Sequence, residues 1–89
     1  MIPFGRIIRL GTVGRDVQGV KRALGRANGT NDPALGTQTF GQTAVADLKR
    51  FQRLEGLTAD GVYGPITHAH LIPAYDDYAY LLYTGHPPP

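Results

Sequence analysis

The sequence predicts a small, mainly α-helical domain, a bundle of three helices joined by ordered Gly- and Pro-rich loops, with an extra helix near the C-terminus. The 89 residues, 42% of them hydrophobic, are enough for one compact core but not for a second domain. Apolar residues recur at three- and four-residue spacing in two stretches, which is the period of an amphipathic helix. Most of the 12 Gly and 7 Pro fall outside these stretches, where loops are expected.

The first predicted helix begins after Gly14 and ends at Asn28-Gly29. Four apolar residues at helical spacing form one stripe: Val17, Val20, Leu24 and Ala27. Asp16 stands in the first turn, where a carboxylate interacts favourably with the helix dipole. Gly19 and Gly25 each disfavour the helix by about 1 kcal/mol relative to Ala, so tertiary packing must stabilise it.

The second predicted helix runs from about Thr43 to Glu55, after a loop over residues 28–41 that Leu35 and Phe40 anchor. Its apolar face is formed by Ala44, Leu48 and Phe51. Its opposite face is basic and carries Lys49, Arg50 and Arg53. Gly56 supplies a left-handed C-terminal stop.

The dense turn formers of residues 57–65 predict consecutive tight turns that lead into a short third helix. Pro65 suits the first position of that helix, because its missing N–H needs no partner there. Asp60 is expected to cap the backbone, and Gly64 is expected to adopt a backbone angle that other residues avoid. An aromatic-Gly pair ends both 37–41 and 60–64, each time just before a helix, which indicates a weak internal duplication.

Residues 73–85 predict a C-terminal amphipathic helix, from about Ala74 to Thr84, packed on a domain formed by residues 1–72. Its apolar face comprises Tyr75, Tyr78, Ala79 and Leu82. The alternative is that this tyrosine-rich face docks on another subunit. Residues 86–89 read as a Pro-rich linker or tail.

Charge is divided unevenly along the chain. Residues 1–53 carry all nine Lys and Arg, whereas the remainder carries four acidic residues and no Lys or Arg. A basic half can meet nucleic acid or anionic cell-wall polymers, or form a solvated surface. No apolar run reaches the length of a signal peptide or a membrane span, so we expect no membrane partner.

The composition argues against catalysis. The chain has no cysteine and no serine, which excludes disulfides, thiolate sites and a serine nucleophile. His68 and His70 are two residues apart, and on a helix they point about 200° apart around the axis, so they do not share a metal ion. Asp76 and Asp77 are adjacent and cannot face each other across a substrate. We therefore predict no catalytic residue, metal or cofactor.

The ordered motifs over about residues 8–72 resemble the peptidoglycan-binding-domain-like (PGBD) family of three-helix cell-wall-binding modules. The opening pattern of the family matches Leu10-Gly11, Gly14, Val17, Val20 and Leu24. The middle pattern matches Phe40-Gly41, Leu48, Phe51-Gln52 and Gly56-Leu57. The most specific, closing pattern matches Asp60-Gly61-Val62-Tyr63-Gly64-Pro65-Ile66-Thr67 and Leu71. The chain departs from the family with Thr37-Gln38 in place of Asp-Gly, Asp47 in place of a small apolar residue and His68 in place of Trp.

The resemblance implies a non-catalytic module that binds the glycan and stem peptide of peptidoglycan in a shallow polar groove. The predicted binding residues are Tyr63, Thr67 and His68 at the entry of the third helix, with Gln52 and Arg53 from the second helix. Arg53 would pair with a stem-peptide carboxylate. Each of the other four also has a structural interpretation, Tyr63 as a core anchor, Thr67 and Gln52 as backbone caps, and His68 as a packed ring.

The resemblance further implies a module that targets a wall hydrolase, such as a phage endolysin or a virion-associated component, with a fused or associated catalytic domain. Such a protein acts at the cell wall, and without a signal peptide it would be made in the cytoplasm and delivered by a holin, a virion or a fusion partner. Two alternatives stay open. One is a helical nucleic-acid-binding domain. The cations of the second helix favour it, and the absence of cations from the third helix argues against it. The other is a PGBD-like interaction domain that has lost wall binding.

Overall fold

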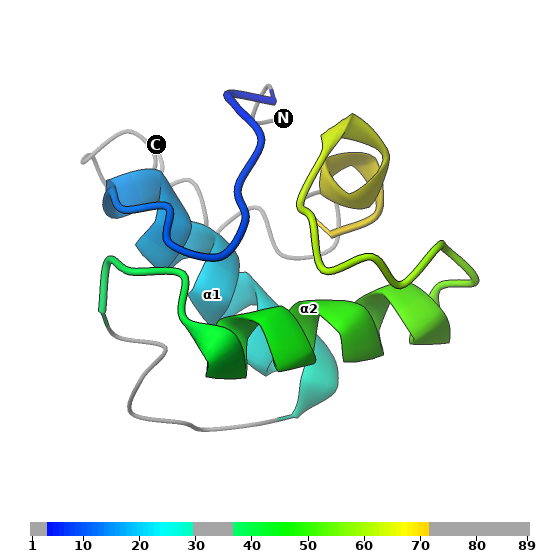
Figure 1. Cartoon of the computed structure of the whole chain (residues 1–89). Coiled ribbons are helices and arrows are strands. Elements are labelled where there is room, and N and C mark those ends of the chain that lie inside the picture. The colour runs from blue at the N-terminus through cyan, green and yellow to red at the C-terminus, as the bar shows by residue number, and fades with distance from the viewer. Residues whose placement is uncertain (1–3, 30–36, 72–89) are drawn as a thin grey trace, which may run out of the picture.

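The computed structural model describes residues 4–29 and 37–71, and within these ranges the chain is mainly helical (Figure 1). Helix α1 spans Arg15–Asn28, helix α2 spans Gln42–Leu54, and a third helix covers residues 65–71. The described residues form no strand beyond two isolated antiparallel bridges, which join Ile8 to Tyr63 and Val13 to Thr39. The predicted fold class is confirmed. Leu35, the predicted helix at 74–84 and the Pro-rich segment at 86–89 lie outside the described residues.

One hydrophobic core lies between the three helices and the segments that join them. Figure 1 shows α2 passing across α1, with the third helix drawn above the C-terminal half of α2. The buried core residues come from every described segment: Ile8, Val17, Val20, Ala23, Leu24, Phe40, Ala44, Leu48, Phe51, Tyr63 and Leu71. The predicted apolar faces of the first two helices are therefore the faces that pack, with Ala27 at the edge of the core.

The helix ends lie close to their predicted positions. Gly29 caps α1 with a φ of 70°, and its backbone N–H points to the carbonyl oxygens of Arg26 and Gly25. Helix α2 is shifted by one residue at each end relative to the prediction, and Gly56 follows it with a φ of 72°. Glycine is favoured at such positive angles because it has no Cβ.

An N-terminal arm, residues 4–14, runs between the start of α1 and the third helix (Figure 1). Ile8 and Tyr63 exchange two backbone hydrogen bonds, with N···O distances of 3.0 and 2.8 Å. Further along the arm, Gly11 donates to the carbonyl of Phe40 at 2.9 Å, and Phe40 donates to the carbonyl of Thr12 at 2.8 Å. The arm thus joins both aromatic-Gly segments of the sequence repeat.

Each aromatic-Gly loop is held by one long polar side chain from the helix before it. Lys21 of α1 is only 2% exposed, and its Nζ donates to Thr37 Oγ1 at 2.6 Å and to the Thr39 carbonyl at 2.7 Å. Gln52 of α2 donates in the same way to Asp60 Oδ1 at 3.0 Å and to the Val62 carbonyl at 3.1 Å. This equivalence supports the internal duplication that the sequence indicates. It also explains the Thr at position 37, whose hydroxyl supplies the acceptor that a carboxylate supplies at position 60.

Candidate functional site

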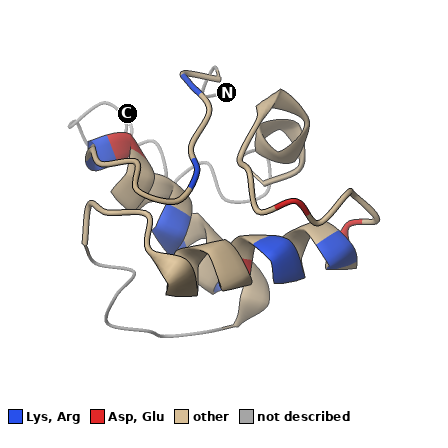
Figure 2. Ribbon diagram, in the orientation of Figure 1, with Lys and Arg blue, Asp and Glu red and all other residues tan. Residues whose placement is uncertain are grey.

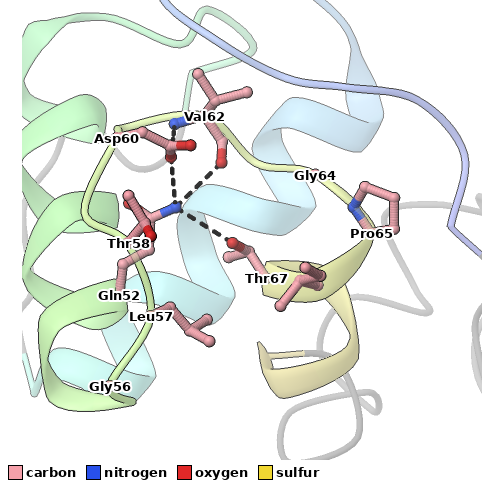
Figure 3. A pocket seen from close by; sticks show the side chains of 10 residues that line it. Gln52, Gly56, Leu57, Thr58, Asp60, Val62, Gly64, Pro65 and Thr67 are labelled. Carbon is pink, nitrogen blue, oxygen red and sulfur yellow. Dashed lines mark hydrogen bonds between the residues drawn. The ribbon is translucent and has the colours of Figure 1, made fainter.

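A hollow of about 500 Å³ lies between the end of α2, the loop that follows it and the start of the third helix (Figure 3). It is lined by Gln52, Gly56, Leu57, Thr58, Asp60, Val62, Gly64, Pro65, Ile66 and Thr67. Apolar carbons and polar groups share this lining, as they do in sites that bind polar ligands with a defined orientation. The closing motif of the sequence therefore forms most of one concave surface.

Gln52 is 1% exposed and forms the hydrogen bonds that hold the lining of the hollow together. Its Nε2 donates to Asp60 Oδ1, the Val62 carbonyl and Thr67 Oγ1, the last at 3.2 Å, as Figure 3 shows. Its Oε1 accepts from the backbone N–H of Gly61 at 3.0 Å. The amide orientation follows from these partners, since Gly61 offers only a donor and the Val62 carbonyl only an acceptor. One side chain thus fixes the loop relative to the third helix.

Asp60 carries the charge of the hollow. Its Oδ1 also accepts a 3.0 Å hydrogen bond from the backbone N–H of Val62, which closes a turn of the kind that Asp forms with the residue two positions on. The bond from Val62, followed by the bond from Gln52, lowers the pKa of this carboxyl below its usual range. Asp60 is exposed, so an ionised carboxylate faces solvent at the hollow.

The strained glycine of the closing motif is Gly61, and the prediction that Gly64 would occupy a forbidden angle is wrong. Gly61 has a φ of 73°, whereas Gly64 is not among the residues with positive φ. A Cβ on Gly61 would lie 3.0 Å from carbons of both Val45 and Lys49, while a Cβ on Gly64 would meet nothing within 4 Å. In this turn the residue directly after Asp60 takes the left-handed angle, which favours glycine.

The five predicted binding residues are placed in three different environments. Gln52 and Thr67 line the hollow but are at most 5% exposed. Tyr63 and His68 do not line it, and they are 0% and 6% exposed. Arg53 is exposed on α2 and also lies outside the lining. Only two of the five therefore belong to the concave surface, and both contribute polar atoms that already hold the loop.

Tyr63 and His68 form an aromatic cluster outside the lining of the hollow. The Tyr63 hydroxyl lies 2.5 Å from His68 Nδ1, and the two rings meet edge to face with centroids 5.7 Å apart. Phe4 of the N-terminal arm packs against His68 with a centroid distance of 5.5 Å. The His at position 68, where the family usually has Trp, is thus a packed ring whose polar atom meets a tyrosine hydroxyl.

Sequence reasoning missed three lining residues that are accessible to a ligand, namely Leu57, Thr58 and Ile66. Thr58 and Ile66 are exposed, and Ile66 has 69% of its surface accessible. The available signal was proximity to the turn motif, since Thr58 lies two residues before Asp60 and Ile66 directly follows Pro65. These side chains, rather than the buried aromatics, can contact a bound molecule directly.

Among the described residues that line the hollow, Asp60 is the charged one. Figure 2 shows acidic segments on the chain that follows α2, with the basic positions of α2 on the helix itself. Glu55, directly after α2, is 3.3 Å from Nδ1 of His70. Within the described ranges, no group of three His, Asp or Glu could hold a metal ion. None of the described helices is long and apolar enough to cross a membrane.

The three helices, their Gly-rich loops and the hollow define a small helical module with a concave surface. The sequence profile described as "Putative peptidoglycan binding domain" matches residues 13–71, more than half of the chain. The chain belongs to this peptidoglycan-binding-domain family. The family consists of binding domains, and the prediction that this chain belongs to it is confirmed.

A solved structure shares the fold. It is a periplasmic domain of the EpsAB fusion protein of the Vibrio vulnificus type II secretion system, with a TM-score of 0.70 and 28% sequence identity. The match covers 78% of this chain and 30% of that one, so the present chain corresponds to less than a third of the solved protein. No curated protein matches the sequence.

Proposed function

We propose that this chain binds peptidoglycan in the hollow between α2 and the third helix, and so holds the protein or assembly to which it belongs at the bacterial cell wall. The observation that carries the proposal is the position of the hollow, which is formed by the closing motif of a peptidoglycan-binding family. Peptidoglycan is rich in hydroxyl, amide and charged groups, and the lining offers Asp60 and Thr58 beside the apolar Ile66.

The module anchors rather than cleaves. One role is the targeting of a wall hydrolase, such as a phage endolysin or a virion-associated component, in which a fused or associated domain performs catalysis. In that role the chain is made in the cytoplasm and reaches the wall through a holin, a virion or its fusion partner. A second role is the attachment of a secretion or envelope assembly to the wall, which the likeness to a periplasmic domain of a secretion protein favours.

Co-sedimentation with purified sacculi tests the proposal, and two matched truncations locate the site. Ile66 and Leu54 are 69% and 66% exposed, but only Ile66 lines the hollow. Ile66→Ala removes ligand contact worth about 1.5 kcal/mol, which weakens sacculus binding roughly tenfold, while Leu54→Ala leaves binding unchanged. Equal losses for the two variants would place the site elsewhere, and failure of the parent chain to sediment would refute wall binding.

Salt dependence separates wall binding from nucleic-acid binding. Binding that depends on six or more phosphate contacts falls by orders of magnitude between about 50 and 200 mM salt. Recognition in a hollow whose described lining residues include one charged side chain should change little over that range. Tight, strongly salt-sensitive binding to DNA would favour the nucleic-acid alternative.

A further inference from the structure

The charge of the hollow limits which part of peptidoglycan can enter it. Among the described residues that line the hollow, Asp60 alone is charged. Arg53, the residue predicted to pair with a stem-peptide carboxylate, lies outside the lining. A carboxylate ligand would therefore meet a carboxylate in the hollow, which like-charge repulsion disfavours.

The geometry of Asp60 leaves half of its carboxylate available. Oδ1 accepts the two hydrogen bonds from Val62 N and Gln52 Nε2, both at 3.0 Å. Oδ2 accepts no hydrogen bond from any described residue. The two bonds orient the carboxylate and favour its ionised form, so Oδ2 is a fixed, anionic acceptor at the hollow.

The nearby cation of α2 does not neutralise this carboxylate. Lys49 packs its aliphatic carbons toward Gly61, 3.0 Å from where a Cβ of that glycine would stand. Within the described part of the chain, no ion pair joins Lys49 to Asp60. The negative charge of Asp60 remains open to a ligand.

We infer that the hollow selects an ammonium group of peptidoglycan, which donates a charge-assisted hydrogen bond to Asp60 Oδ2; this inference rests on the proposed wall binding. Peptidoglycan can offer such a group from two sources, the free side-chain amine of the diamino acid in an uncrosslinked stem peptide and the amine of de-N-acetylated glucosamine. Both are primary amines that carry a positive charge when protonated, and both become neutral amides on N-acetylation.

The test compares untreated sacculi with sacculi whose amino groups have been acetylated. Asp60→Asn keeps Oδ1 as the acceptor for Val62 and Gln52 but removes the charge, and an unchanged melting temperature shows that the loop is intact. Glu55→Gln is the matched control, because it removes a neighbouring carboxylate outside the lining. We expect acetylation to weaken binding of the parent chain by about tenfold to a hundredfold, the range for one hydrogen bond to a charged group.

Asp60→Asn should bind both kinds of sacculi as weakly as the parent binds acetylated ones, whereas Glu55→Gln should behave like the parent. Parent binding that is equal on treated and untreated sacculi overturns the ammonium inference and leaves the proposed function intact. Absence of parent binding to either overturns the proposed function itself. Competition by a soluble stem-peptide fragment with a free diamino-acid amine, or by glucosamine oligomers, supports the inference and identifies the source; competition by neither overturns it.

Discussion

Replacement of Gln52 by Met should unfold the loop that forms the hollow. Met fills a similar volume but has neither the donors that reach Asp60, Val62 and Thr67 nor the acceptor that meets Gly61 N. Gly61 and Thr67 are buried, so their polar groups lose their partner without gaining water. Asp60 is exposed and Val62 is half-buried, so those two groups can be rehydrated.

Each buried group left unsatisfied costs about 1 to 3 kcal/mol, which places the destabilisation of Gln52→Met near 3 kcal/mol. In a domain of this size about 3 kcal/mol lowers the melting temperature by roughly 12 to 24 °C, and it removes a large share of a total stability of roughly 5 to 15 kcal/mol. Thermal and urea unfolding followed by far-UV circular dichroism measure the change. Gln42→Met, the same substitution at the exposed start of α2, should leave the melt unaltered. A decrease in melting temperature of less than about 4 °C for Gln52→Met would refute the idea that the Gln52 hydrogen bonds hold the loop in place.

Two further predictions concern backbone strain and pH. Gly61→Ala should cost about 1 to 3 kcal/mol in urea unfolding, because φ is 73° and the new Cβ meets Val45 and Lys49 at 3.0 Å, whereas Gly64→Ala should be within about 0.5 kcal/mol of the parent. Equal losses of stability for Gly61→Ala and Gly64→Ala would contradict the conclusion that the backbone strain lies at Gly61. The hydrogen bond from Arg6 lowers the pKa of Asp16 in the folded state. The ionised Asp16 therefore stabilises the folded state fully above about pH 4, and this contribution is lost as the pH falls through the folded pKa. Asp16→Asn should therefore lose less stability than the parent between about pH 6 and pH 3, and parallel losses would show that the pair contributes nothing.

The sequence predicted the parts of the fold that depend on local chemistry. Helical periodicity located α1 and α2 to within a residue, since an apolar stripe and a glycine stop are both local signals. Local reasoning failed for the glycines of the closing motif. Gly61 follows Asp60, whereas Gly64 lies between Tyr63 and Pro65, and only Gly61 adopts the left-handed angle.

The candidate site was harder to predict, because distant segments decide which side chains stay accessible. Tyr63 would suit a sugar-binding surface, yet the N-terminal arm covers it by pairing with its backbone at Ile8. Lys21 would be expected in solvent, but acceptors from residues 37–39 bury it. Ile66 lines the hollow because the third helix packs against the loop after α2. Hydrophobic periodicity in the sequence gives no information about that packing.

The pairing of the N-terminal arm with Tyr63 changes where the domain should be considered to begin. The family match starts at residue 13, yet Ile8 is fully buried and holds the segment that enters the third helix. A fragment cut at the family boundary would lose this side chain, which contributes about 1.5 to 3 kcal/mol of burial, together with both backbone bonds to Tyr63. The hollow lies on the segment released by that cut, so a shortened fragment that fails to bind would give a misleading negative result. Fusion proteins that include this module should therefore keep the residues ahead of the first helix and place any linker before Phe4.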